Sequence, residues 1–446
     1  YVSYIDTVGR DPEIKKENIP DSVLFIIKRL KGAGFLSFLV GGCVRDLICQ
    51  KISKDWDIVT DASPGQIKKI FFDYKALLIG RSFQTITLII DSQTYHISTL
   101  RGIESRGVGE NRENNLLAEQ EKYQLIINDL LCRDFTINSL AWNPDKGILD
   151  PSGGLPDLNR KLIRSLQPAI RFKEDPLRMI RAVRIACQLN FTIDCLTGKS
   201  IIKYAFLINR VSPERIREEL YAVFQTSEAK RGIILLRKYG LEQFIFSIDK
   251  VKRERMGGKE WELLPSAVFD EYRKELSYWL AVWGRFSFGS YRQAQILYIP
   301  LLYNLKFHRE IIKKLKILLS REWITMDYSS GKNIRVLMSE LGKENCKTMF
   351  YLKKMLLWSE KKVDMLAKLE KEEELLKNEL RKNPPISFKD LAIKGEDLIE
   401  MGIPEGKRLG EVLQSLLTEV LFSPENNNKD FLIRMVEKIR AYYLSS

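Results

Sequence analysis

The sequence predicts an α+β protein, with a small mixed α/β head followed by an elongated all-α neck, body and tail. Up to about residue 150, short apolar runs that stop at glycine or turn residues alternate with helical segments. From about residue 156 onward, helical periodicity dominates and strand signals nearly vanish. The 446 residues suit roughly two to four domains. We expect a head at 1–150, a neck at 151–211, a body at 212–330 and a tail at 331–446.

Four short apolar runs predict the strands of the head. They are Phe35–Val40, Trp56–Thr60, Thr85–Ile90 and Thr94–Leu100. The last two flank Asp91-Ser92-Gln93, as in an antiparallel hairpin. Helices are expected over Val44–Cys49 and after Ser63-Pro64, where serine suits the N-cap and proline the first turn. The polar stretch 102–128 is expected to be a mobile loop.

Proline and asparagine mark helix boundaries in the rest of the chain. Ser212-Pro213 is expected to open a helix. Met349–Leu380 predicts one or two long charged helices that end at Asn383-Pro384-Pro385. Leu409–Leu421 predicts a further helix after the turn at 402–406. The head is thus followed by helices alone.

The composition narrows the class of protein. A formal net charge of +14 favours a polyanionic partner such as nucleic acid. His96 and His308 are the only histidines, too few for a histidine-rich zinc site, and six scattered cysteines without a C-x-x-C motif suit a reducing compartment. No apolar run is long enough for a membrane span. We expect a cytoplasmic protein. Because the sequence begins at Tyr1 rather than Met, a mitochondrial or plastid protein that has lost a targeting peptide stays open.

The first candidate site follows the first strand. Gly41 and Gly42 lead into a helix whose backbone N–H groups can approach a phosphate, and Arg45 would add a guanidinium to the same anion. Asp55 and Asp57 alternate on the next strand, so both carboxylates point to one face. Two neighbouring carboxylates repel each other unless a cation lies between them, which suits Mg²⁺ with substrate phosphates. Each of these two segments alone has a plain alternative. The alternative for the glycines is a simple turn, and the alternative for the aspartates is a pair of solvated carboxylates.

The second candidate site has arginines at every third position. Asp175, Arg178, Arg181 and Arg184 would form a stripe of neighbouring side chains on one helix. A solvated, salt-bridged helix face is the plain alternative. The functional hypothesis is that Asp175 accepts from the exocyclic amine of a base while Arg178 donates to the adjacent ring nitrogen. Cytosine and adenine present that amine and acceptor side by side, whereas uracil and guanine do not, so this pair could select C and A without a template.

Several motifs together resemble the class II nucleotidyltransferase family, which comprises CCA-adding tRNA nucleotidyltransferases and poly(A) polymerases. The first two are G-G-x-V-R-D at 41–46 and D-x-D-I-x-T at 55–60. Further similar elements lie at 133–138, 150–158, 174–182 and 212–220. They occur in the family's order over roughly residues 24–240, and beyond them the likeness rests mainly on 402–410. With only His308 in its C-terminal half, the chain cannot build the histidine-aspartate phosphohydrolase module of some relatives.

The resemblance implies nucleotidyl transfer from CTP or ATP to the 3′ hydroxyl of a tRNA, with metal ions held by Asp55 and Asp57. His96 stands where relatives commonly carry an acidic residue, so Asp134 is the remaining candidate for a third catalytic carboxylate; His96 itself is expected to be a half-exposed strand residue. The resemblance also implies a set of nucleotide-binding positions. They are Gly41, Gly42, Arg45, Arg133, Asn138, Asp175, Arg178, Arg181 and Arg184.

Two departures from the family pattern keep other functions open. Cys132 replaces the first arginine of the family's R-R-D-F-T element, so a catalytically reduced RNA-binding protein is one alternative. Poly(A) polymerase is the alternative among enzymes, although Ser82 stands where those enzymes tend to carry a second basic residue and 83–88 looks more like CCA-adding relatives. The basic amphipathic segment 305–317 fits RNA, a membrane surface or water, and the basic residues of 250–255 are equally ambiguous.

Overall fold

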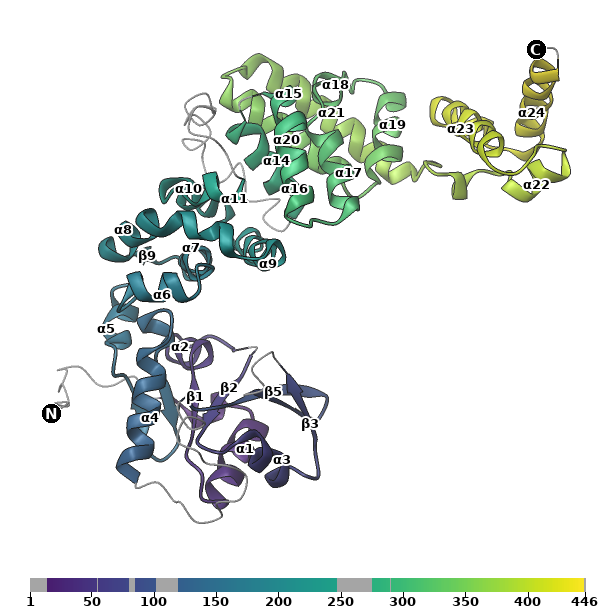
Figure 1. Cartoon of the computed structure of the whole chain (residues 1–446). Helices are drawn as coiled ribbons and strands as arrows, with labels where there is room; N and C mark the ends of the chain where they lie inside the picture. Colours follow the sequence, from purple (N-terminus) through teal and green to yellow (C-terminus); the bar gives the residue numbers. More distant parts are fainter. Residues whose placement is uncertain are drawn as a thin grey trace. The chain divides into compact units, whose positions relative to one another are not determined.

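The computed structural model describes residues 14–53, 55–79, 85–101, 119–246, 275–288 and 290–444, and the α+β prediction is confirmed (Figure 1). Contacts divide the chain into two compact units. One contains the residues up to Val211 together with Tyr239–Leu241, and the other contains Ser212–Lys238 and Glu242–Ser446. The expected head and neck segments therefore share one unit. No helix of the described residues is long and apolar enough to cross a membrane.

A mixed sheet forms the centre of the head, with the described strands in the order β3-β4-β5-β2-β1-β6-β7. They are β1 (Ser37–Val40), β2 (Asp57–Thr60), β3 (Lys75–Ile79), β4 (Thr85–Ile90), β5 (Gln93–Thr99), β6 (Ala141–Asn143) and β7 (Gly147–Leu149). β4 and β5 form the expected hairpin, and its turn residues Asp91 and Ser92 have φ angles of 48° and 63°, as in a type I′ turn. β2 pairs with β5 in parallel, which places Asp57 beside His96.

Different helices cover the two faces of this sheet. The helices are α1 (Asp21–Gly32), α2 (Gly42–Ile48), α3 (Pro64–Ile70) and α4 (Glu119–Leu131). Phe38 of β1 and Val59 of β2 are buried with Ile126 of α4, so α4 covers their face. Ser37, which precedes Phe38, donates to the carbonyl of Ile27 in α1 at 3.5 Å. Because neighbouring strand residues point to opposite faces, α1 covers the other face, and α3 lies beside it (Figure 1).

Helix α4 corrects the expected loop at 102–128. Residues 119–131 are helical, and Leu125, Ile126 and Leu130 are buried against the sheet. The first half of this helix is so polar that the apolar side stayed hidden in the sequence. Residues 102–118 lie outside the described part of the chain. The helix expected after Ser63 is present, and its capping box is complete, with Ser63 and Gln66 each accepting from the other's backbone N–H.

The segment after the head is helical apart from the short strands β8 and β9. Its elements are α5 (Gly154–Asn159), β8 (Leu162–Ile163), α6 (Pro168–Glu174), α7 (Arg178–Leu189), β9 (Thr192–Ile193), α8 (Cys195–Tyr204) and η4 (Ala205–Arg210), while η3 (Thr136–Asn138) precedes β6 in the head. The carboxylate of Asp150 accepts from the backbone N–H groups of Gly154 and Leu155 at 2.7 and 2.8 Å, which caps α5. The predicted turn at 150–154 thus orders the start of a helix.

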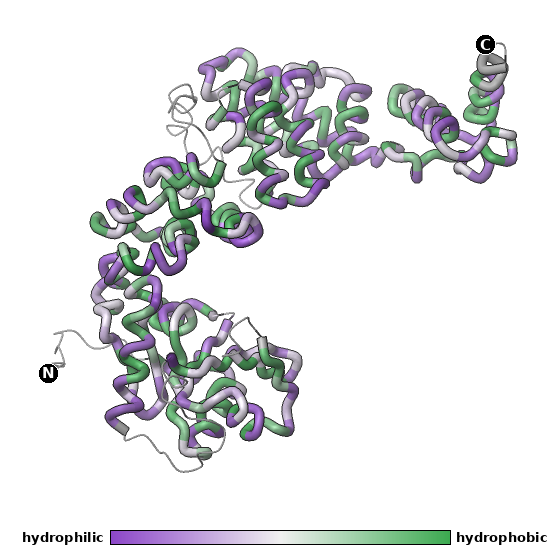
Figure 2. The backbone as a smooth tube through the Cα atoms, viewed as in Figure 1, coloured by the Kyte–Doolittle hydropathy of each residue, from purple (hydrophilic) through white to green (hydrophobic). Residues whose placement is uncertain are grey.

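The second unit is all-α among its described residues. Its helices are α9 (Pro213–Phe224), α10 (Ala229–Lys238), α11 (Leu241–Ile245; Leu241 itself belongs to the first unit), α14 (Leu276–Ser287), α15 (Tyr291–Gln293), a π-helix (Ala294–Tyr298), α16 (Ile299–Asn304), α17 (Arg309–Leu318), α18 (Arg321–Thr325), α19 (Gly331–Leu341), α20 (Cys346–Ser359), α21 (Val363–Lys382), α22 (Gly395–Glu400), α23 (Lys407–Phe422) and α24 (Lys429–Leu444). The helix after Ser212, the two long charged helices and the helix near Leu409–Leu421 are as predicted. Hydrophobic and hydrophilic residues are interspersed along these helices (Figure 2).

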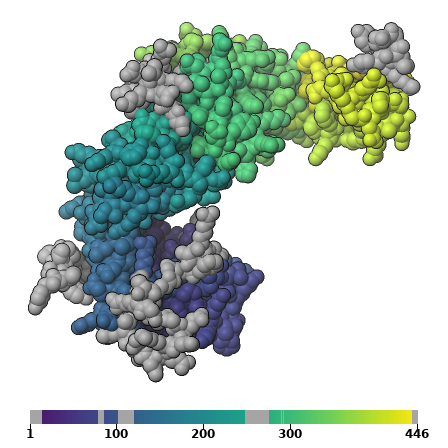
Figure 3. All heavy atoms as spheres, in the orientation of Figure 1, coloured from purple at the N-terminus to yellow at the C-terminus, as the bar shows by residue number. Residues whose placement is uncertain are grey.

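Two parts of this unit bear on the sequence expectations. In α17, Ile312 and Leu315 are buried while Lys313 and Lys316 are exposed, so the amphipathic prediction is confirmed, whereas Lys306 precedes the helix. The last helices, α22 to α24, pack around a core of their own that includes Leu398, Leu416 and Leu432 (yellow in Figure 3). The basic residues of 250–255 lie outside the described residues.

Candidate functional site

The diglycine turn connects β1 to α2. Gly41 has a φ angle of 79°, which favours glycine, and its N–H donates to the carbonyl of Leu140 at 3.0 Å. A Cβ at Gly41 would lie 3.2 Å from Nη1 of Arg133, so a side chain there would crowd this guanidinium. Gly42 is the first residue of α2. The turn therefore brings two expected nucleotide-binding positions, Gly41 and Arg133, together.

Arg45 is buried beside this turn, with 7% of its surface exposed. Its Nε and Nη2 donate to Oδ1 of Asp46 at 2.9 and 2.7 Å, and its Nη1 donates to Oδ1 of Asn138 at 2.8 Å. The guanidinium thus links α2 to η3, and Asp46 and Asn138 hold three of its nitrogens. Any anion that Arg45 binds must share it with these partners.

Asp55 and Asp57 lie at the start of β2, with the buried Trp56 between them. Asp57 is the first residue of the strand, and Asp55 precedes it. Asp57 shares its face of the sheet with Val59 and therefore with α4. Asp57 is exposed by surface area, but the protein groups that surround its carboxyl reduce its hydration, and this desolvation raises its pKa. Arg133 and His96 oppose this effect, and Asp55 adds to it. A cation between the two carboxylates would offset this unfavourable setting.

His96 stands next to Asp57 on the parallel strand β5. It is half-buried, as expected, and its Nδ1 lies 3.1 Å from Oγ1 of Thr87. The histidine therefore occupies the same face as the carboxylate pair. Cys132, the other departure from the family pattern, is a partly exposed residue just after α4.

Asp134 is held by three donors. Its Oδ1 accepts from the backbone N–H of Phe135 at 2.8 Å and from Nδ2 of Asn138 at 3.2 Å, and its Oδ2 accepts from Nη1 of Arg181 at 3.2 Å. Among the described residues, no group of three or more His, Cys, Asp or Glu side chains could hold a metal ion. The structure thus connects Asp134 to arginine and amide groups, while Asp55 and Asp57 remain a pair.

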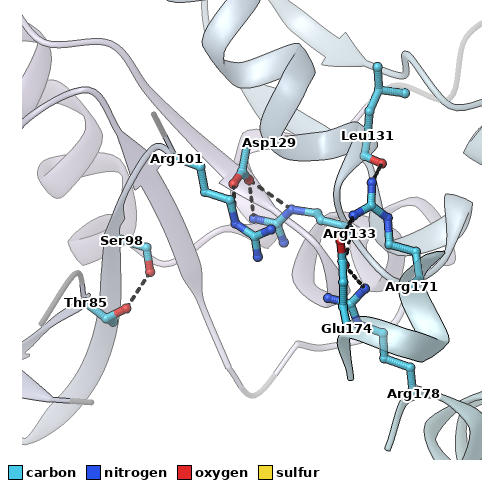
Figure 4. A network of polar contacts seen from close by, with 9 residues as sticks. All are labelled: Thr85, Ser98, Arg101, Asp129, Leu131, Arg133, Arg171, Glu174 and Arg178. Atoms are coloured by element: carbon cyan, nitrogen blue, oxygen red, sulfur yellow. Dashed lines mark hydrogen bonds and ion pairs between the residues drawn. The ribbon is translucent and has the colours of Figure 1, made fainter. Parts of the chain in front are cut away.

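Arg133 is oriented by a residue that sequence patterns did not reveal. Oδ2 of Asp129 accepts from Nε and Nη2 of Arg133 at 3.3 and 3.1 Å, and Oδ1 of Asp129 lies 3.5 Å from Nε of Arg101 (Figure 4). Asp129 lies one helical turn before Arg133, so the four-residue spacing was visible in the sequence. Nothing in the sequence indicated that Arg101 joins them.

The arginine stripe on α7 is present, but Asp175 does not belong to it. Arg178, Arg181 and Arg184 are half-buried on α7, and the residues between them are buried. Asp175 has extended backbone angles and lies between the end of α6 and the start of α7, where its Oδ1 accepts from the N–H of Leu177 at 3.3 Å. Pro176 follows Asp175, and a residue before proline avoids the helical conformation, which explains the break.

Glu174 orients Arg178, a second feature that the sequence did not reveal. Its carboxylate accepts from Nη1 of Arg178 at 3.2 Å and from Nη1 of Arg171 at 2.9 Å, and the hydrogen bond from Arg171 lowers its pKa (Figure 4). Nη2 of Arg171 donates to the carbonyl of Leu131 at 3.3 Å, which ties α6 to the end of α4. Arg184 donates to Gln188, one turn further along α7.

Family models match three consecutive parts of the chain. The poly A polymerase head domain matches residues 37–164, the RNA and SrmB-binding site of polymerase A matches 190–249, and tRNA nucleotidyltransferase domain 2 matches 272–436. The solved Bacillus stearothermophilus CCA-adding enzyme in complex with CTP has a TM-score of 0.70 at 24% identity, over 95% of this chain and 98% of that chain. The Thermotoga maritima CCA-adding enzyme in complex with tRNA has a TM-score of 0.56 at 20% identity, over 95% and 96%. At such identities these likenesses show the fold.

Sequence relatives point the same way. The CCA-adding enzyme of Bacillus subtilis is 30% identical over 419 residues, which are 93% of this chain and 96% of that protein. Poly(A) polymerase I of Salmonella typhi is 35% identical over 240 residues, 52% of this chain and 51% of that protein. The CC-adding tRNA nucleotidyltransferase of Halalkalibacterium halodurans is 36% identical over 245 residues, 55% and 59% respectively. The chain thus spans about half the length of the curated poly(A) polymerases that it matches.

Fold and site together define a nucleotidyltransferase-type head on a helical body. The chain belongs to the family of tRNA nucleotidyltransferases and poly(A) polymerases. Enzymes of this family use divalent metal ions, and the paired carboxylates of Asp55 and Asp57 are oxygen ligands of the kind such ions prefer.

Proposed function

We propose that this protein is a template-independent RNA 3′-end nucleotidyltransferase that adds C, A or both from CTP and ATP to the 3′ end of tRNA. The observation that carries this proposal is the grouping of Asp57, Gly41 and Arg133: β1 ends next to the start of the antiparallel strand β2, so Gly41 lies near Asp57, and Arg133 lies against Gly41. A carboxylate that suits a metal ion thus lies near a cation and a backbone turn that suit phosphates. The relatives named CCA-adding and CC-adding enzymes support the tRNA substrate.

In this proposal, Asp55 and Asp57 hold Mg²⁺, which when bound neutralises the triphosphate and activates the attacking hydroxyl. The raised pKa of Asp57 supports the assignment, because a nearby cation would restore its charged form. Gly41, Gly42 and Arg133 line the position proposed for the triphosphate. Arg45, Asn138 and Asp134 keep the surrounding elements in place through their mutual hydrogen bonds, and Asp134 contributes to catalysis in this indirect way.

Base choice is proposed to rest on Asp175 and Arg178. The break between α6 and α7 frees Asp175 from helical geometry, and Glu174 holds the guanidinium of Arg178. An acceptor and a donor side by side match the pairing edges of cytosine and adenine. Arg181 and Arg184 extend this basic face of α7 toward the phosphates or the RNA. The four-part division into head, neck, body and tail, with the tail binding tRNA, is part of the same proposal.

A poly(A) polymerase remains the second candidate, because several curated relatives of that name match at 35% identity over 240 residues. The choice between the two rests on residues 78–88, of which 80–84 lie outside the described residues. One experiment decides. The protein is incubated with Mg²⁺ and a tRNA that lacks its 3′ end, with CTP, ATP or both, and product length is measured on a gel. Up to about three added residues support the tRNA enzyme, a long ladder of A supports polyadenylation, and no extension supports an RNA-binding protein.

A further inference from the structure

Two guanidinium groups share the single carboxylate of Asp129. Arg133 contacts one carboxylate oxygen through Nε and Nη2, and Arg101 approaches the other through Nε at 3.5 Å (Figure 4). Arg133 follows the end of α4, and Arg101 follows the end of β5. The three side chains thus join α4 to the end of β5, an interior strand of the sheet. One negative charge against two positive charges leaves a net charge of +1.

The exposure of these groups differs in a way that suits ligand binding. The Asp129 side chain is 9% exposed and that of Arg133 is 24% exposed, whereas Arg101 keeps 59% of its side chain exposed. Asp129 is the one partner of the Arg101 guanidinium within the described ranges, and it engages Nε rather than the terminal nitrogens. An exposed guanidinium can bind a phosphate with two parallel hydrogen bonds.

The location connects this cluster to the transfer site. Nη1 of Arg133 lies 3.2 Å from where a Cβ of Gly41 would be, and the charge of Arg133 acts on Asp57. A phosphate that reaches Arg133 at the diglycine turn is therefore next to the guanidinium of Arg101. We propose that Arg101 and Arg133 together bind a phosphate group of the substrates, with Asp129 as the positioning residue that holds both. This inference rests on the proposed function for the identity of the substrates.

The phosphate belongs either to the incoming nucleotide or to the RNA primer, and two probes distinguish these sources. The first is inorganic tripolyphosphate, whose binding is measured by calorimetry. The second is tRNA lacking its 3′ end, whose binding is measured by filter retention. Arg101→Ala is expected to weaken one of them about tenfold, since it removes a charge-assisted hydrogen bond. Arg101→Lys keeps the charge but loses the planar guanidinium. Its affinity for the affected probe should lie between the affinities of Arg101→Ala and the wild type.

Asp129 is tested by its effect on substrate affinity. Asp129→Asn is expected to raise KM for the same substrate that Arg101→Ala affects, by several-fold, while kcat changes less than twofold; Asp129→Glu should restore part of the loss. The matched control is Arg29→Ala, which breaks another Arg–Asp pair of the head, Arg29 with Asp73 at 2.7 Å. It should leave both affinities unchanged, whatever it does to stability.

The inference is overturned if Arg101→Ala and Arg101→Lys bind both probes like the wild type, because Arg101 would then only link β5 to α4. A variant that does not fold is recognised by its melting curve and replaced by Arg101→Gln. The two proposals fail separately. A wild-type protein that extends no tRNA contradicts the proposed function, whereas unchanged tripolyphosphate and RNA binding in the Arg101 variants contradicts the phosphate site.

Discussion

Arg181 on α7 donates through Nη1 to Oδ2 of Asp134 at 3.2 Å, across 47 positions of the sequence. Oδ1 of the same carboxylate accepts from Asn138, whose amide oxygen accepts from Arg45 on α2. A continuous chain of charged and amide groups therefore runs from the helix after the diglycine turn to the helix that carries Arg178. Because each group holds the next, the position of α7 relative to the transfer site depends on polar contacts as well as on packing.

Removing this ion pair should misplace α7, the helix for which we propose a role in base selection. We expect Arg181→Ala to reduce kcat/KM for CTP and ATP by about tenfold, because it leaves the half-buried Asp134 without its cation. Asp134→Asn should reduce it less, since the amide oxygen still accepts one hydrogen bond. Steady-state kinetics with both nucleotides measure the effect, and a double mutant that shows the sum of the two single effects would contradict the coupling.

The carboxylate pair should be essential for transfer. Asp55→Ala or Asp57→Ala is expected to lower nucleotide addition by about 10³-fold or more, since each removes a proposed ligand of metal ions, which stabilise such transition states by several kcal/mol. Binding of tRNA should survive in both variants. Asp145→Ala, at an exposed turn of the same head, is the control and should add nucleotides normally. Substantial addition by either Asp55→Ala or Asp57→Ala would contradict the metal assignment.

Arg178 and Glu174 should act on base choice. Arg178→Ala is expected to weaken C and A incorporation and to relax discrimination against U and G, because it removes the proposed donor to the ring nitrogen of the base. Glu174→Gln should shift selectivity in the same direction but less, since Arg178 loses its ion pair and keeps its charge. Competition among the four nucleotides in one reaction measures both effects. An unchanged preference for C and A in Arg178→Ala would exclude side-chain templating.

Alanine substitutions at two glycines should have opposite effects on the free energy of unfolding. A Cβ at Gly154 would lie 2.3 Å from the carbonyl oxygen of Thr136, so Gly154→Ala should lower the free energy of unfolding by about 1–3 kcal/mol. Gly410 lies exposed within α23 with nothing near the position that a Cβ would occupy. Gly410→Ala should therefore raise the free energy of unfolding by about 0.5–1 kcal/mol. Calorimetry measures both, and a stabilising Gly154→Ala would mean that the turn at 150–154 relaxes freely.

A buried ion pair should make the second unit sensitive to acid. Arg335 donates to Glu379 at 2.9 Å and to the carbonyls of Leu421 and Phe422, which joins α19, α21 and the end of α23. Burial raises the pKa of Glu379, but hydrogen bonds from Lys382 and Arg335 outweigh burial and hold this pKa below its ordinary value. The contribution of Glu379 to stability is therefore present above the unfolded pKa of about 4.3 and is lost as the pH falls through the lower folded value.

The test of this pair combines mutation with pH. Arg335→Ala should lower the free energy of unfolding by about 1–3 kcal/mol at pH 7, because Glu379 keeps only its contact with Lys382 and the carbonyls of Leu421 and Phe422 lose their donor. Below pH 4 the difference from the wild type should shrink. Lys407→Ala removes an exposed pair with Glu411 and should change stability little at any pH. Thermal unfolding across pH 3–8 provides the measurement, and an Arg335→Ala effect as large at pH 3 as at pH 7 would argue against a role for the ionised Glu379.

Local signals predicted much of the fold. The strand before Gly41, the hairpin around Asp91 and the capped helix after Ser63 are present because each depends on residues a few positions apart. The expected loop at 102–128 was wrong from residue 119 onward. The first half of α4 is polar, and the apolar residues of its second half are buried because the helix packs on the sheet. Asp175 was wrongly placed on a helix, although Pro176 marked the break.

Sequence alone determined which residue types are available for transfer chemistry: the diglycine bend, the paired aspartates and the arginines spaced by three. Folding decided which of them meet. Arg101 reaches Asp129, Arg181 reaches Asp134 and Arg45 reaches Asn138 only because a sheet and its covering helices bring distant segments together. Spacing along a chain reports neighbours within a helix or strand, whereas contacts between elements follow from how hydrophobic faces pack, which no single segment encodes.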